Sequence, residues 1–421
     1  MQQLNIPTSI DQLDPGEWAS FEPYFTQLMN QPITPENAGD WLMGWSNLAK
    51  LFEESFAWVY IQKSIDTTNE AFEQTFLKMI EAVLPEATMA DNQLKLRLLS
   101  EALPYLPDGL ELTVKNLKTE SELFREENIP LNTELEKLGN EYDKRTGSLS
   151  MDWEGEQKNL SQLGVYLNRK DRQIREKAWR GTMGLWLSER ENLNALYTKM
   201  LKHRVEVAKN AGFDDFRAYS FLSKKRFDYT PADCETFHNA IEQVVVPAAQ
   251  KIYARKQSLL NVDQLRPWDV SVEPGDTPPL APYEGQDSLI QHSLNVFQQI
   301  DPQLAHYFGT MADEDLLDLD TRSGKALGGY CSRLALRKRP FIFMNGVGLH
   351  DDVQTLLHEA GHAFHEFESN SLPYIWQTES PMEFSEVASM AAVVLGDAEK
   401  HQVLRAFPVG FAELPERTAG R

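Results

Sequence analysis

Hydrophobic residues recur every three to four positions through roughly the first 200 residues, with Pro and Gly between the periodic segments. The clearest case is residues 36–63, where this spacing predicts one long amphipathic helix with a buried face. The apolar stripe of this segment includes Trp41, Trp45, Leu48, Leu51 and Phe52.

Further helices are expected along the same half of the chain. One is predicted to end at Pro85, because proline interrupts the backbone hydrogen bonding of a helix. The pattern continues over residues 93–103, and a long helical segment is predicted over residues 169–212. Gly181 and Gly184 are candidate interruptions within that segment.

The pattern changes in the second half of the chain. Residues 266–285 contain five prolines and two glycines and are predicted to form a loop, followed by a helix at residues 287–300. Aromatic and aliphatic residues over 327–337 and 340–346 predict two strands of a small sheet. A chain of 421 residues exceeds what one core usually serves, so we expect a mainly α, two-lobed protein.

Composition narrows the classes of protein. With 42% hydrophobic and 25% charged residues the chain is an ordinary globular sequence, and its net charge of −22 argues against a nucleic-acid partner. Cys234 and Cys331 are far apart, which indicates no disulfide framework. Neither a signal peptide nor an apolar run long enough to span a membrane is evident, and we expect a cytoplasmic location.

The segment "LLHEAGHAF" (356–364) carries the strongest chemical signal. Residues four apart lie above one another on a helix, so His358 and His362 can direct their imidazoles at one metal ion. Glu359 follows the first histidine, where its carboxylate can accept a proton from a water that the metal activates. The predicted metal is Zn²⁺, because two imidazoles and a carboxylate suit it.

The third protein ligand is not fixed by spacing alone. His365 lies seven residues after His358 and His350 precedes the helix, but a second helix crossing the first is a better source. Residues 380–396 are predicted to form that helix, with Pro381 in its first turn. Glu383 and Glu386 are one turn apart there, and both stay candidates.

At this point the chain resembles a known family, the oligoendopeptidase F and thimet oligopeptidase group of zinc oligopeptidases. The likeness extends from about Met151 to Met390. It rests on "LLDLDTRSGKALGGYC", "PFIFMNG", "DDVQTLLHEAGHAFH" and "EFSEVASM", with support from "RQIREKAW", "HRVEVAKNAGFDDFRAYSF" and "LRPWDV".

The resemblance implies a fold, a ligand set and a substrate class. The family's E-[VA]-x-S glutamate falls on Glu386, which becomes the expected third ligand, with Glu383 as a supporting acid. The implied fold is a two-lobed helical metallopeptidase, with the zinc at the floor of a deep channel that admits short peptides. We assign residues 1–185 to an N-terminal helical domain and residues 186–421 to the catalytic domain.

The strand region before the histidine helix is a candidate substrate site. An extended peptide can add to an exposed strand edge through main-chain hydrogen bonds, and glycines allow a second backbone to come close. Gly328, Gly329, Tyr330 and Asn345 are therefore candidate substrate contacts. The alternative is a buried structural hairpin with glycines at bulges.

Two departures from the family are expected to matter. After Leu395 the sequence loses the resemblance, and His401 is the only later histidine, so we expect a C-terminally shortened member without the Tyr and His residues that bind the oxyanion. Helices that pack against such a segment would then expose apolar surface. In addition, Val393 occupies the position of a supporting acid, whose loss typically costs about 10–100-fold in metal affinity or activity.

The sequence therefore supports two main functional hypotheses. The first is a zinc-dependent endopeptidase that acts on short peptides, with Glu359 as general base and then general acid. The second is a catalytically impaired zinc-binding, peptide-binding protein without oxyanion support. A helical scaffold with an accidental HExxH is the third hypothesis. The oligomeric state is not predicted.

Overall fold

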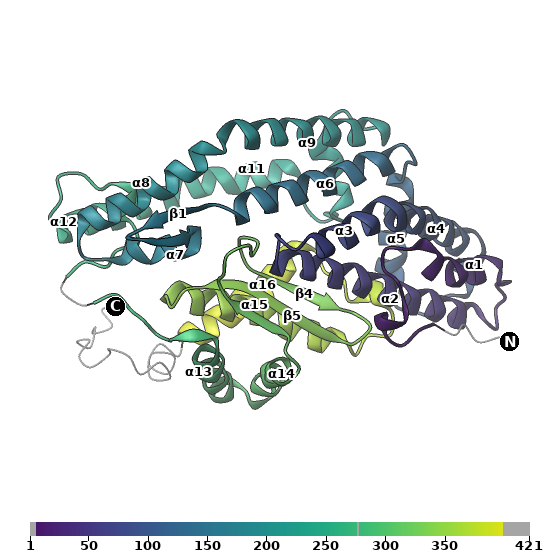
Figure 1. Ribbon diagram of the computed structural model, residues 1–421. Coiled ribbons are helices and arrows are strands. Elements are labelled where there is room, and N and C mark those ends of the chain that lie inside the picture. The colour runs from purple at the N-terminus through teal and green to yellow at the C-terminus, as the bar shows by residue number, and fades with distance from the viewer. Residues whose placement is uncertain (1–5, 276–277, 399–421) are drawn as a thin grey trace.

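Helices make up most of the chain in this computed structural model, which describes residues 6–275 and 278–398 (Figure 1). The helices of the first half are α1 (Glu22–Asn30), α2 (Ala38–Ile65), α3 (Glu70–Lys78), α4 (Leu84–Arg97), α5 (Glu111–Leu123), α6 (Asn128–Gly147), α7 (Leu160–Gly164), α8 (Arg172–Ser188) and α9 (Arg190–Asn210). Those of the second half are α10 (Phe216–Ser223), α11 (Pro231–Ala240), α12 (Val246–Leu259), α13 (Gly285–Ile300), α14 (Pro302–Asp313), α15 (His350–Ser369) and α16 (Met382–Ala398).

The helix interruptions predicted at Pro85, Gly181 and Gly184 are wrong. Pro85 does not end a helix, because a π-helical turn at Met79–Val83 leads into α4 and places the proline in the first turn, where its missing N–H is tolerated. Gly181 and Gly184 lie within the continuous helix α8. The predicted long helix at residues 36–63 is confirmed as α2.

The strands form two small sheets. β1 (Ser150–Trp153) and β2 (Glu156–Asn159) make an antiparallel hairpin. In the second sheet the central strand β5 (Arg339–Gly346) pairs in parallel with β3 (Leu317–Asp320) and antiparallel with β4 (Tyr330–Leu334). β5 is buried along most of its length because it packs against helices on its faces and strands at both edges.

The strands of the two sheets correct the sequence analysis in three ways. Gly328 and Gly329 precede β4 rather than belonging to it. The alternating sequence "LDLD" forms β3, which the analysis missed. It also missed the β1–β2 hairpin, whose two-residue turn has positive φ at Glu154 and Gly155 (57° and 91°), as a tight hairpin turn requires.

Two large cores organise the described residues. One joins α13, α14, the second sheet and α15. The other joins the N-terminal helices with Ile375 and Trp376, which return from the chain after α15; Trp376 lies 4.4 Å from Trp45 between ring centroids. The predicted domain boundary between residues 185 and 186 stays a prediction.

Figure 1 shows α6, α8, α9 and α11 as a layer that runs alongside the layer containing α2, the second sheet, α15 and α16. Within the described chain, every helix is too short or too polar to cross a membrane. Apolar side chains are exposed on α16: Met382, Phe384, Val387 and Met390.

Candidate metal centre

Helix α15 carries the His-Glu-x-x-His segment and is fixed at both its start and its inner face. The Asp352 carboxylate accepts hydrogen bonds from the backbone amides of Leu349 (2.7 Å) and Val347 (2.8 Å), which satisfies donors at the helix start. The acidic side chain there also suits the positive end of the helix dipole. The buried face contains Val353, Leu356, Leu357, Ala360, Ala363 and Phe364.

A glycine allows α16 to cross α15 closely. A Cβ atom at Gly361 would lie only 2.6 Å from the Cα of Ser389 and 2.9 Å from the carbonyl oxygen of Ala388. Both contacts are with backbone atoms, which cannot turn away as a flexible side chain can. The glycine that directly precedes His362 thus lets the second helix approach until Glu386 lies opposite the two histidines.

Three side chains converge where these helices cross. His358 Nε2 lies 3.3 Å from Glu386 Oε2, and His362 Nε2 lies 3.8 Å from Glu386 Oε1. The candidate ligand atoms of all three residues lie within 4.8 Å of one another. The imidazole planes are 86° apart, so the rings approach a common point from different directions.

The other candidate ligands lie elsewhere. Glu383 Oε1 accepts hydrogen bonds from Arg226 (2.7 Å) and Tyr229 (2.5 Å). This carboxylate is therefore bound to residues other than the two histidines. His350 begins α15, and its Nε2 lies 3.3 Å from the side-chain nitrogen of Gln354. His365 lines the cavity over the site but is not part of the three-residue group.

Glu359 is buried beside this group, with 7% of its surface exposed. Burial and the negative charge of Glu386 raise the pKa of Glu359 to about 7, while a hydrogen bond from the backbone of Cys331 opposes the shift. The position where a Cβ of Gly329 would lie is 3.6 Å from Glu359 Oε1. A carboxylate in such a setting can both accept and return a proton near neutral pH.

The surroundings of His362 favour its neutral form. Burial lowers the pKa of His362, and the neighbouring His358 and His365 add to this effect, while Glu386 opposes it. On Glu386, Oε2 accepts a hydrogen bond from the Ser389 hydroxyl (3.2 Å). Two imidazole nitrogens and one carboxylate form the donor set of a catalytic zinc site with three protein ligands, so these residues fit zinc.

The site opens into a cavity of about 440 Å³, which we call the metal cavity. Gly329 and Tyr330 line it, and the Tyr330 ring is held by stacking on Phe343 and by a 2.5 Å hydrogen bond between its hydroxyl and that of Ser64. Gly328 and Asn345 do not line it. The Asn345 amide instead donates to the carbonyl oxygens of Ala326 (2.8 Å) and Gly328 (2.9 Å) and braces the loop before β4.

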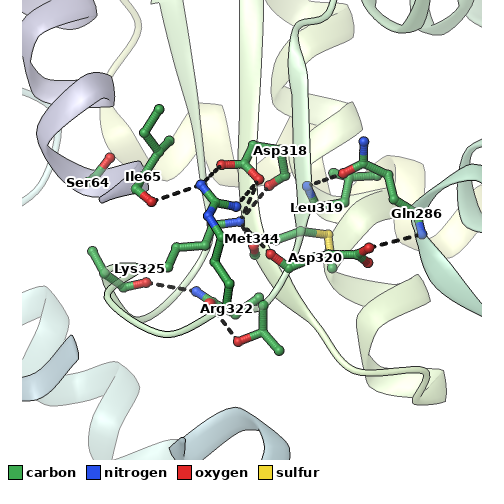
Figure 2. A network of polar contacts seen from close by, with 12 residues as sticks. Ser64, Ile65, Gln286, Asp318, Leu319, Asp320, Arg322, Lys325 and Met344 are labelled. Atoms are coloured by element: carbon green, nitrogen blue, oxygen red, sulfur yellow. Dashed lines mark hydrogen bonds and ion pairs between the residues drawn. The ribbon is translucent and has the colours of Figure 1, made fainter. Parts of the chain in front are cut away.

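A buried lysine that the sequence analysis did not single out anchors the same loop (Figure 2). Lys325 Nζ donates to the Asp318 carboxylate (2.9 Å) and to the carbonyl oxygens of Asp320 (2.9 Å) and Met344 (2.6 Å). Its side chain thereby ties the loop to β3 and β5. Arg322 adds a bond from the loop to Ile65 at the end of α2, which fixes where Gly329 and Tyr330 lie.

Two predictions from the sequence concern residues after Glu386, namely Val393 and His401. Val393, at the expected position of a supporting acid, packs against the core that contains α15. The prediction for His401 and its neighbours falls outside the described residues.

Comparison with protein families gives one match that covers more than half of the chain. The profile of Peptidase family M3 matches residues 165–403. This range contains every residue of the candidate metal centre.

Individual relatives are distant. The chain is 22% identical over 233 residues to oligoendopeptidase F, chromosomal, of Lactococcus lactis subsp. cremoris, and 25% identical over 251 residues to an oligoendopeptidase F homolog of Mycoplasma pneumoniae. These alignments cover 54% and 56% of this chain but only 36% and 38% of the relatives, so the chain matches well under half of each relative's length.

Solved structures show the same fold. A Bacillus anthracis str. Ames protein assigned as an oligoendopeptidase F superposes with a TM-score of 0.86 at 24% identity, over 92% of this chain and 71% of that protein. Pz peptidase A, solved with an inhibitor, also gives 0.86 at 24% identity, over 92% of this chain and 68% of its own.

Proposed function

Because the chain belongs to peptidase family M3, we propose that it is a zinc-dependent endopeptidase that hydrolyses internal bonds of short peptides. The observation that carries this proposal is the convergence of His358, His362 and Glu386 within 4.8 Å, with the buried Glu359 carboxylate beside them. His358, His362 and Glu386 would hold one zinc ion. When bound, zinc supplies Lewis acidity, which acidifies water and polarises the carbonyl group of a peptide bond.

The protein's own residues then have distinct roles. Glu359 would take a proton from the attacking water and return it to the leaving amine, since its carboxylate lies buried beside the three candidate ligands. The Ser389 hydroxyl orients the carboxylate of Glu386 through its hydrogen bond to Oε2.

The substrate would bind as an extended strand. Among the described residues β4 pairs only with β5, and a peptide would pair with its other edge. Gly329 and Tyr330 lie at the start of this edge and line the metal cavity. A channel that receives a single extended chain suits short peptides rather than folded proteins.

The proposal is tested by zinc content and peptide cleavage on the same preparations. We expect one zinc per chain in the wild type, measured by mass spectrometry, and loss of zinc in Glu386→Ala. Cleavage of a quenched fluorescent peptide library should fall by more than about 100-fold in Glu359→Gln while its zinc is retained. Glu368→Gln is the matched control, since Glu368 is exposed on the same helix and bonds to Tyr307 instead.

Two results would count against the proposal. Stoichiometric zinc without cleavage of any peptide would favour a zinc-binding, peptide-binding protein instead. A wild-type protein that is folded and contains no zinc would exclude both functions and leave the histidine segment without a metal role.

A further inference from the structure

The pairing of β3 with β5 contains an irregularity close to the loop that lines the metal cavity. Between Asp318 and Asp320 the register shifts, so that one residue of β3 faces two residues of β5, Met344 and Asn345. A bulge of this kind disrupts the ladder of hydrogen bonds between strands. Main-chain oxygens at the bulge therefore need hydrogen-bond donors from elsewhere.

Lys325 supplies these donors. Its Nζ donates to the main-chain oxygens of Asp318 (3.1 Å), Asp320 (2.9 Å) and Met344 (2.6 Å), and to the Asp318 carboxylate (2.9 Å) (Figure 2). The side chain is fully buried, and burial lowers the pKa of Lys325 to about 8, while Asp318 opposes the shift. At pH 7 the group is therefore an ammonium, which has three protons to donate.

The bulge is linked to the wall of the metal cavity through Asn345. The side-chain amide of this residue donates to the carbonyl oxygens of Ala326 and Gly328. Gly328 directly precedes Gly329, which lines the metal cavity. The Cβ position of Gly329 is 3.6 Å from Glu359 Oε1, so a shift of this loop changes the space beside the proposed general base.

A second link runs through the ring of Phe343. Lys325 Nζ lies 4.5 Å from the centroid of this ring, within the range of a cation–π contact. The Tyr330 ring stacks on Phe343, with the centroids 4.7 Å apart and the planes at 8°. Tyr330 lines the metal cavity as well, so both of its loop-side wall residues depend on contacts that the ammonium organises.

We propose that Lys325 is a positioning residue for substrate binding, whose ammonium holds the bulge that sets Gly329 and Tyr330 against the bound peptide. This inference rests on the proposed function, because it takes the metal cavity as the place where a peptide binds. The bonds of Lys325 go to β3 and β5, whereas Glu359 and the candidate ligands lie on α15 and α16. Lys325 should therefore affect the affinity for the peptide much more than the chemical step.

The test is the steady-state kinetics of Lys325→Met with one peptide from the quenched fluorescent library at pH 7. We expect KM to rise about five- to tenfold, the value of one hydrogen bond to the peptide, with kcat within about twofold of the wild type. A purely structural role gives the opposite pattern. Partial unfolding or loss of zinc reduces the number of active molecules, which lowers the apparent kcat and leaves KM unchanged.

A second variant keeps the buried lysine and removes only the link from the bulge to the loop. Asn345→Ala should raise KM by a similar factor, and the double variant should be no worse than either single one, because both act through the same loop. Unchanged KM in Asn345→Ala would overturn the proposal even if Lys325→Met does not fold.

Lys95→Met is the matched control for the loss of a buried lysine. Lys95 pairs with Asp91 and Glu120 among the N-terminal helices and has 14% of its side chain exposed. This variant should be less stable than the wild type in urea unfolding and should have the same KM. An equal rise of KM in Lys95→Met and Lys325→Met would overturn the specific role of Lys325.

The outcomes separate this inference from the proposed function. A lower kcat with unchanged KM in Lys325→Met would overturn the positioning role and leave the peptidase standing. If the wild type cleaves no peptide, the peptidase proposal fails, and binding of a labelled peptide to Glu359→Gln, measured by fluorescence anisotropy, tests Lys325 instead. Five- to tenfold weaker binding after the added Lys325→Met change would support its role, whereas equal binding, or no binding to either protein, would overturn it.

Discussion

Gly361 shows how one missing side chain positions a candidate metal ligand. The absence of a Cβ lets α16 lie against α15, and the two imidazoles then face Glu386. Any larger residue must push the helices apart, because the atoms that it meets belong to the backbone of Ala388 and Ser389.

We predict that Gly361→Ala lowers the free energy of unfolding by about 1–3 kcal/mol, the usual cost of overpacking, and also weakens zinc binding. Urea unfolding and chelator competition measure the two effects. Gly184→Ala is the control, since Gly184 is also helical but has open space at its Cβ position. It should stabilise by about 0.4–1 kcal/mol, and the same loss in both variants would contradict the explanation.

At the scale of elements, the first turn of α16 is fastened to the segment that follows α10. Arg226 and Tyr229 both bond to Glu383, one turn before the candidate ligand Glu386. These contacts fix the position of the start of α16, whereas the close crossing at Gly361 fixes the position of its middle.

We predict that Arg226→Met raises the dissociation constant for zinc by about tenfold, as loss of a group that orients a ligand typically does. Competition with a fluorescent chelator measures it. Arg217→Met is the control, because Arg217 pairs with Glu235 on the exposed surface at 3.4 Å. Unchanged zinc affinity in the Arg226 variant would show that α16 is held without this contact.

The buried carboxylate of Asp269 links two further elements, α8 and the 3-10 turn Pro267–Asp269. Burial alone would raise the pKa of Asp269, but hydrogen bonds from Arg172 and Arg175 outweigh it and lower the pKa to about 2. The depressed pKa means that the stabilisation is present above the unfolded value of 3.8 and is lost as the pH falls towards 2.

We therefore expect Asp269 to contribute about 2 kcal/mol of pH-dependent stability, because its pKa is lowered from 3.8 to about 2. In urea unfolding, Asp269→Asn should be less stable than the wild type at pH 7, and the difference should narrow between about pH 4 and pH 2. Glu176→Gln removes an exposed ion pair on the same helix and should change stability little. A difference that does not vary with pH would exclude this account.

At the scale of the whole molecule, the candidate ligands connect α15, which belongs to the core with α13, α14 and the second sheet, to α16, which packs against it. A ligand that binds only the folded state raises the free energy of unfolding, by about 4 kcal/mol when it is present at a thousandfold excess over its dissociation constant. We predict that EDTA lowers the Tm of the wild type by several degrees and leaves that of Glu386→Ala unchanged. An equal effect of EDTA on both proteins would place the stabilising metal elsewhere.

The sequence by itself determined the features that depend on local periodicity. Helical spacing brought His358 and His362 to one face, and the apolar stripe of residues 36–63 predicted α2. These predictions hold because each depends on the geometry of one continuous helix. The predictions at Pro85 and Gly181 failed because a single proline or glycine does not decide by itself whether a helix ends. A π-helical turn leads into α4 at Pro85, and α8 continues through Gly181.

The tertiary structure decided which residues from different helices lie together. Spacing left Glu383 and Glu386 as equal candidates and the family resemblance favoured Glu386, but only the crossing of α15 and α16 puts Glu386 beside the histidines, while Arg226 binds Glu383. Likewise, Trp45 and Trp376 are separated by most of the chain, yet they pack together and line one cavity of about 420 Å³. The distance between such residues is set by how helices pack, which the local pattern of polar and apolar positions does not encode.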